Sequence, residues 1–220
     1  MAMNQSYARL KTRQRAERHT HSEGLALRVH RALSWLNRAE KCESDEDGRF
    51  IFLWISFNAA YAQQFSLDEQ SAEKQKAEAF IKKLVALDTH NRLYDLLWTV
   101  FPSTIRVLLD NRYVFQPFWD AKGRGEDDAL WKAAFDGANR AARSALGRGD
   151  TATVLSVVLA RLYTLRNQLV HGGATWNSQV NREQIRDCAR LMSELMPRII
   201  EIMMDHPHTL WGDAVYPVIS

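Results

Sequence analysis

Turn-forming residues are scarce in this chain, and their scarcity limits the folds that it can adopt. The 220 residues include only 10 glycines and 5 prolines. A sandwich or barrel of many short strands needs frequent turn residues, whereas long helices need few. Hydrophobic residues make up 46% of the chain and charged residues 25%, as is usual for globular proteins with a buried core. We therefore predict an all-α protein.

Apolar residues recur at helical spacing in several long segments. The predicted helices cover residues 23–41, 49–64, 72–87, 91–109, 128–146, 151–171 and 179–205. The fourth helix should bend or restart at Pro102, and Pro197 should kink the last. Within the second helix, residues 50–57 alone are also compatible with a strand, because short aromatic and β-branched runs are ambiguous.

These helices predict one domain, a helical bundle of six or seven helices over residues 23–210. Asp150 and Thr151 are N-cap candidates for the helix over 151–171, and Gly172-Gly173 should end it. Residues 111–128 are rich in aromatic and turn-forming residues, which favours a surface insertion. Residues 211–220 are expected to form a C-terminal tail.

The positive charge of the chain is concentrated at its N-terminus. Residues 1–22 contain five Lys or Arg and one Glu, while the whole chain carries only +3. We expect residues 1–22 to form a basic, partly disordered tail, either simply solvated or screening nucleic-acid phosphates.

Several classes of site are missing from the sequence. It contains no glycine-rich phosphate loop, no dinucleotide-binding pattern, no nucleophile elbow and no paired-histidine zinc motif. His206-Pro207-His208 and residues 45–47 fit a helix end and a solvated loop better than metal sites. We expect no cofactor and no metal. Cys42 and Cys188 lie far apart and should be reduced thiols.

The apolar runs of the chain are shorter than a membrane span. None approaches the ~20 residues that a bilayer requires. No apolar segment follows the basic N-terminal residues, so the sequence does not match a secretory signal. The sequence therefore predicts a cytoplasmic protein that does not enter a membrane.

Polar residues interrupt the second half of the apolar helix predicted at 151–171. At ~100° per residue, five of them form one polar stripe: Arg161, Thr164, Asn167, Gln168 and His171. Arg166 falls instead among the leucines of the apolar face. A permanent cation should not remain unpaired there. Either a buried carboxylate pairs with it, or that face meets another subunit and an anionic ligand in a cleft.

The run RNQLVH, from Arg166 to His171 at the end of this helix, resembles the motif of the HEPN superfamily. That motif is an arginine and a histidine separated by four to six residues, often with a polar residue directly after the arginine. Here four residues separate the pair, Asn167 follows the arginine, and a glycine pair follows the histidine. The run FLWISFNAAYA, residues 52–62, is similar to the early core helix of Apea-like members. By helix order the resemblance covers roughly residues 25–205, with residues 111–128 as an insertion.

The resemblance implies an HEPN-like bundle and a metal-independent endoribonuclease that cleaves RNA through attack of the 2′-OH. It also implies a homodimer, in which two copies of the motif form a composite active site. His171 would act as base or acid, Arg166 would bind phosphate, and Asn167 would hold the histidine or a phosphate. A toxin held by an antitoxin, or an anti-phage effector, is the implied biological role. The alternative is a non-catalytic HEPN-like module that binds a partner protein, a nucleotide or RNA.

Overall fold

The computed structural model describes residues 6–61, 70–179, 181–212, 214 and 216. Regular structure in these residues is entirely helical, which confirms the all-α prediction. They form ten α-helices where six or seven were expected, because residues 6–17 and part of the predicted insertion are also helical and the segment after residue 90 is split. The chain divides into two compact units, where the sequence predicted one domain: Met1–His90 with Ile185–Ser220, and Asn91–Gln184.

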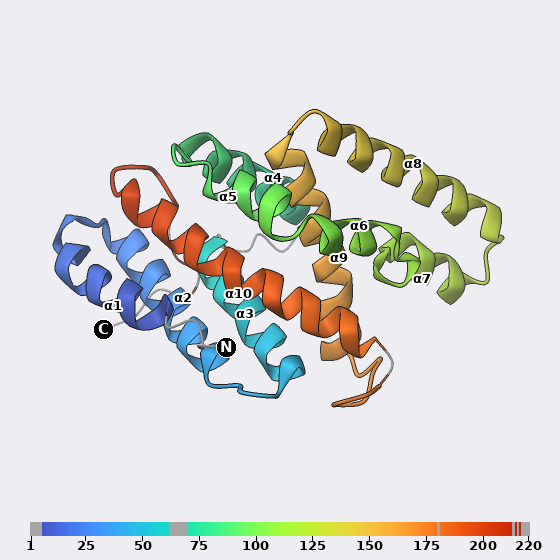
Figure 1. Cartoon of the computed structure of the whole chain (residues 1–220), viewed down its shortest axis with the longest axis horizontal. Coiled ribbons are helices and arrows are strands. Elements are labelled where there is room, and N and C mark those ends of the chain that lie inside the picture. The colour runs from blue at the N-terminus through green and yellow to red at the C-terminus, as the bar shows by residue number, and fades with distance from the viewer. Residues whose placement is uncertain (1–5, 62–69, 180, 213, 215, 217–220) are drawn as a thin grey trace. The chain divides into compact units, whose positions relative to one another are not determined.

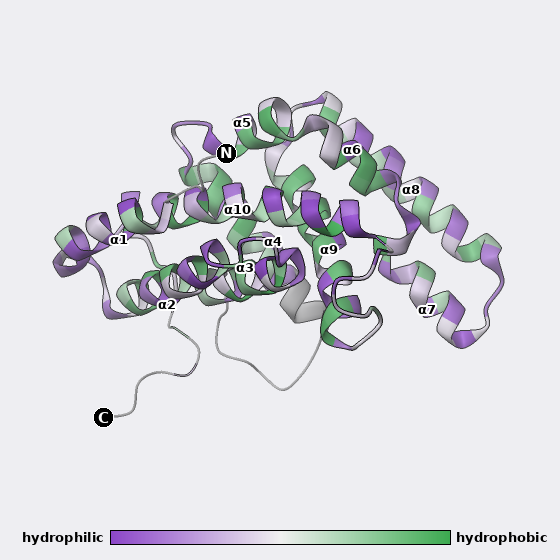
Figure 2. Ribbon diagram, turned by 60° about the horizontal axis from the view of Figure 1, so that its bottom comes forward, coloured by the Kyte–Doolittle hydropathy of each residue, from purple (hydrophilic) through white to green (hydrophobic). Residues whose placement is uncertain are grey.

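The first unit contains the N-terminal helices and most of the last helix (Figure 1). Its elements are α1 (Ser6–Glu17), the 3-10 turn η1 (Arg18–Thr20), α2 (Glu23–Glu40), α3 (Glu46–Tyr61), α4 (Gln70–Leu87) and α10 (Arg182–Asp205) from Ile185 onward. Hydrophobic and hydrophilic residues alternate along α10, as expected for a helix buried on one side (Figure 2). Pro197 lies inside α10 and is buried.

Residues 6–17 form a helix that packs on the unit, where a partly disordered tail was expected. Leu10 is completely buried. The backbone N–H of Tyr7, at the start of α1, donates a hydrogen bond to Oε1 of Glu40 over 3.0 Å. Arg9 pairs with Glu201, and Arg13 lies 2.8 Å from Oδ1 of Asp205. Acidic groups of α10 therefore pair with two of the arginines that suggested a free tail, and Glu40 of α2 binds the first turn of α1.

The beginning of the expected C-terminal tail also belongs to the packed part of the first unit. Trp211 is buried, and its ring meets that of Phe80 edge to face at 6.1 Å. The backbone carbonyl of Gly212 accepts a hydrogen bond from Nε of Arg28. The other described residues of this segment are Ala214, which is buried, and Tyr216, which is exposed; the remaining residues of 211–220 lie outside the description.

Two histidines of the first unit make its stability depend on pH. Burial lowers the pKa of His21, and neither ring nitrogen has a hydrogen-bond partner among the described residues. The pKa of His30, which is largely exposed, is also lowered, by partial desolvation and by the neighbouring charges of Lys11 and Arg31. The folded state therefore binds fewer protons than the unfolded state below about pH 6.5, so acidification through that value should destabilise the protein.

We expect the unfolding temperature of the wild type to fall between pH 7.5 and pH 5.5, and to fall less in a double variant carrying His21→Phe and His30→Gln. Differential scanning calorimetry at both pH values measures the effect. An equal fall in the two proteins would show that other groups cause it.

The second unit contains α5 (Arg92–Asp95), the π-helical turn η2 (Leu96–Val100), α6 (Pro102–Asp110), the 3-10 turn η3 (Arg112–Val114), α7 (Gln116–Arg124), α8 (Asp128–Gly147) and α9 (Thr151–Val170). The predicted restart at Pro102 is confirmed, since proline occupies the first turn of α6. Within this unit α9 packs against α6, α8 and η3.

Residues 111–128 form η3 and α7 rather than an irregular loop. Pro117 lies in the first turn of α7, where the missing N–H costs nothing, and Gly125 ends the helix with a φ of 64°. The aromatic residues that suggested a surface segment form a small core with α8: Phe115, Phe118, Trp131 and Phe135. Proline and glycine thus mark the ends of α7 rather than breaking it.

Candidate functional site

The helix α9 begins and ends where the sequence predicted. Asp150 is its N-cap and accepts a hydrogen bond from the backbone N–H of Thr153 over 3.0 Å. At the other end the N–H of Gly172 donates to the carbonyl of Leu169, and that of Gly173 donates to the carbonyl of Gln168. Gly172 has a φ of 72°, so this end is a Schellman motif. His171, as the C-cap, occupies a fixed backbone position.

The motif residues Arg166, Asn167 and His171 form a continuous strip at this end of α9. Nη1 of Arg166 donates a hydrogen bond of 3.0 Å to Oδ1 of Asn167. Asn167 precedes His171 by four residues, which places the two side chains on the same face one turn apart. The bond to Asn167 therefore draws the guanidinium of Arg166 around the helix toward His171, although the two backbone positions lie ~140° apart.

The three residues of the strip are accessible to solvent. Arg166 and Asn167 are half-buried, and His171 is exposed. Within the described chain Arg166 has no carboxylate partner, and the imidazole of His171 makes no hydrogen bond. Of the two explanations weighed for Arg166, the buried carboxylate is thus not found. The guanidinium keeps N–H groups that can bind an anion.

The predicted polar stripe of α9 is wrong for two of its five members. Arg161 is only 3% exposed and Thr164 only 2% exposed. The guanidinium of Arg161 lies over the rings of Phe115 and Phe135, at 4.4 and 5.3 Å from their centroids. The cation buried on α9 is therefore Arg161 rather than Arg166. Sequence periodicity could not show this, because the covering rings come from two other segments: Phe115 from the expected insertion and Phe135 from α8.

Arg161 is an unusually poorly compensated buried charge. Its Nη2 lies 3.3 Å from Oδ1 of Asn139, while Nε and Nη1 are buried with no hydrogen-bond partner among the described residues. Desolvation lowers the pKa of Arg161 to about 10. Cation–π contacts with the two phenyl rings stabilise the charge.

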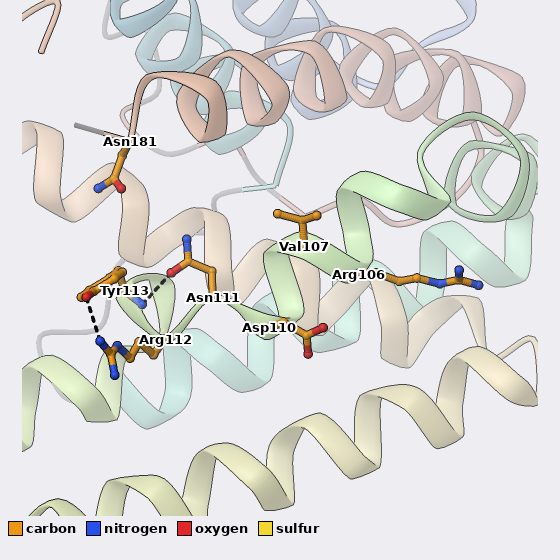
Figure 3. A pocket seen from close by; sticks show the side chains of 7 residues that line it. All are labelled: Arg106, Val107, Asp110, Asn111, Arg112, Tyr113 and Asn181. Carbon is orange, nitrogen blue, oxygen red and sulfur yellow. Dashed lines mark hydrogen bonds between the residues drawn. The ribbon is translucent and has the colours of Figure 1, made fainter. Parts of the chain in front are cut away.

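Tyr113 and its neighbours are functional candidates that sequence reasoning missed. Nε2 of Gln168, on the turn of α9 that precedes His171, donates a hydrogen bond to the backbone carbonyl of Tyr113. Tyr113 also lines a depression of about 760 Å³ between α6, η3 and the segment before α10 (Figure 3). The high density of aromatic and basic residues at 111–124 was the sequence feature that could have indicated a binding site there.

The two minor metal candidates take up structural roles. Nε2 of His206 lies 2.8 Å from the backbone carbonyl of Leu87. Asp45 precedes α3 and accepts a hydrogen bond from the N–H of Gly48. Over the residues that the structure covers, no group of three or more His, Cys, Asp or Glu side chains is arranged to hold a metal ion. Cys42 and Cys188 are both free and buried.

A search among the helices of the described ranges finds none with the length and apolar character to cross a bilayer. Comparisons of the chain with family models, curated proteins and solved structures gave no match. Any functional assignment therefore depends on the residues at the end of α9 and their surroundings.

Proposed function

We propose that this protein is an HEPN-like, metal-independent endoribonuclease whose catalytic residues are Arg166, Asn167 and His171. The observation that carries the proposal is the strip at the end of α9, in which an exposed imidazole lies one turn from a linked arginine and asparagine. These groups are the ones that RNA cleavage without a metal requires: a proton carrier that works near neutral pH and a permanent cation for phosphate.

The proposed reaction is an internal transfer of the phosphoryl group. A base removes the proton of the 2′-OH, and the resulting oxygen attacks the adjacent phosphorus. An acid donates a proton to the departing 5′-oxygen, which leaves a 2′,3′-cyclic phosphate and a 5′-hydroxyl. Arg166 would stabilise the negative charge that builds up on the phosphorane oxygens.

One copy of the motif offers a single histidine for two proton transfers. A homodimer in which two α9 ends share one composite active site would supply both the base and the acid, together with a second arginine. The outer face of α9 is compatible with a protein contact, because it carries the large apolar residues Tyr163 and Val170, which are 39% and 48% exposed.

The alternative function is a non-catalytic module that binds a partner protein, a nucleotide or RNA through the same strip. One observation favours it: the imidazole of His171 has no hydrogen bond among the described residues that would fix its tautomer and direction. In a catalytic protein, substrate or the second subunit would have to provide that orientation. Both functions would use Arg166 to bind phosphate, so a measurement of RNA cleavage is needed to distinguish the nuclease from the binding module.

By its resemblance the proposed nuclease is a toxin controlled by an antitoxin or another regulatory protein, or an anti-phage effector, acting on cytoplasmic RNA. The basic helix α1 carries Arg15 and Arg18 on its exposed side or just beyond its end, where they can add non-specific affinity for RNA.

The chemistry is tested by removing the attacking group from the substrate. We expect the purified protein to cleave a labelled single-stranded RNA in the presence of EDTA and to leave the all-deoxy oligonucleotide of the same sequence intact. Denaturing gels measure the products, and a 2′,3′-cyclic phosphate end is expected. Cleavage of the deoxy strand would contradict the mechanism, and binding of RNA without cleavage would favour the alternative.

A further inference from the structure

The depression beside η3 combines an exposed aromatic ring with amide and guanidinium groups. Tyr113 is 40% exposed. Asn111 and Asn181 line the space around it (Figure 3). The amide of Asn111 already donates to Oε1 of Gln184 over 2.9 Å and accepts from the N–H of Tyr113 over 2.8 Å, so Asn181 is the amide that would meet a ligand. Aromatic rings flanked by amide donors and acceptors are how proteins bind unpaired nucleobases, by stacking and by hydrogen bonds to the base edges.

The ring of Tyr113 is held in a fixed position. Its backbone carbonyl accepts hydrogen bonds from Nε1 of Trp119, over 2.8 Å, and from Nε2 of Gln168. The ring of Phe118 meets it edge to face at 5.6 Å. The guanidinium of Arg112 lies 5.0 Å from its centroid, and Nη2 of Arg112 bonds its hydroxyl over 2.9 Å. A rigid ring loses little conformational freedom when a base stacks on it.

The charges around the depression favour a polyanion. Arg112 at one end and Arg106 at the other are exposed, and neither has a carboxylate partner in the described part of the chain. The one acidic lining residue, Asp110, is neutralised by Nη2 of Arg143, at 2.7 and 3.0 Å from its two carboxylate oxygens. Phosphates on either side of a stacked base would meet two arginines.

One hydrogen bond connects η3, which borders the depression, to the helix that carries the proposed active site. Gln168, which bonds the Tyr113 carbonyl, precedes His171 by three residues and shares its side of α9. A nucleotide bound at Tyr113 would therefore place the neighbouring part of its strand near the imidazole. The wall of the depression is thus hydrogen-bonded to the turn of α9 that precedes the proposed catalytic histidine.

From this juxtaposition we propose that Tyr113 and Arg112 form a stacking site for an unpaired base of single-stranded RNA, with Asn181 at the base edge. The inference rests on the proposed nuclease function and adds its substrate class: the enzyme takes single strands, because a base paired in a duplex cannot reach the ring.

Binding of a non-cleavable RNA tests the site separately from catalysis. The probe is a fluorescein-labelled 12-nucleotide 2′-O-methyl RNA, measured by anisotropy with the full chain, in single-stranded, duplex and internally abasic forms. We expect Tyr113→Ala to raise the Kd for the single strand roughly 5- to 100-fold, as loss of one base–aromatic stack does. Tyr113→Phe, which keeps the ring, should stay within about threefold. Tyr94→Ala is the matched control, since Tyr94 is 41% exposed in the same unit.

Each result bears on one proposal or the other. Unchanged RNA binding by Tyr113→Ala would overturn the stacking site, even if the wild type cleaves RNA. Weaker binding by Tyr113→Ala in a protein that cleaves no RNA would support the stacking site and overturn the nuclease. Equal affinity for the duplex or abasic forms, or no binding at all, would overturn the stacking site.

Discussion

Replacing His171 or Arg166 with alanine is expected to abolish cleavage of single-stranded RNA while leaving the helical content of the protein unchanged. Loss of a general acid or base slows a reaction by about 100-fold or more, and loss of the phosphate-binding cation has an effect of similar size. The fold should tolerate both changes, because His171 is exposed at the C-cap of α9 and, among the described residues, Arg166 bonds only its neighbour Asn167.

Gel assays measure the cleavage of RNA, and circular dichroism measures the helical content of each variant. Arg140→Ala and His90→Ala are suitable controls, since both residues are exposed and lie outside the strip. Growth on expression in bacteria gives a second readout: the wild type should arrest growth, and His171→Ala should relieve the arrest. Cleavage by both variants at the rate of the wild type would refute the assignment of the site.

The largest expected loss of stability follows from Arg28→Met in the first unit. Arg28 is only 1% exposed. Its Nη1 donates a hydrogen bond of 2.8 Å to the carbonyl of Ala60, and its Nε donates one of 3.1 Å to the carbonyl of Gly212. Methionine keeps the apolar stem but leaves two carbonyls without their charged donors. We expect the free energy of unfolding to fall by about 3 kcal/mol.

Urea denaturation followed by circular dichroism measures this loss. Arg15→Met is the matched control: Arg15 is exposed on α1, so its substitution should change the free energy of unfolding by less than ~0.5 kcal/mol. A denaturation midpoint for Arg28→Met equal to that of the control would show that the two hydrogen bonds do not stabilise the unit.

The sequence predicted the long helices well, because each has a one-sided apolar pattern or a clear end. Asp150 and the pair Gly172-Gly173 fixed both limits of α9. The N-terminal helix was missed because only Leu10 and a few polar side chains of α1 are buried, and the acidic residues that hold it lie far away in the sequence. Helices stabilised by distant ion pairs leave little periodic pattern of their own.

The candidate site was predicted less completely than the fold. The motif residues were proposed from their spacing, and the hydrogen bond between Arg166 and Asn167 joins neighbours in the sequence. Which arginine of α9 is buried depends on Phe115 and Phe135, which lie more than twenty residues before it in the chain. Tyr113 and its depression likewise arise from packing between separate elements.

The backbone carbonyl of Tyr113 connects α7 with the end of α9. The Tyr113 carbonyl accepts from Trp119 of α7 and from Gln168 of α9, so a shift of α7 alters the turn that carries Asn167 and leads to His171. A molecule with different affinities for two positions of α7 would then also bias the geometry around the histidine, without touching it. Allosteric control of the proposed nuclease would then operate through residues 111–124, and an inhibitor would not need to occupy the strip at the end of α9.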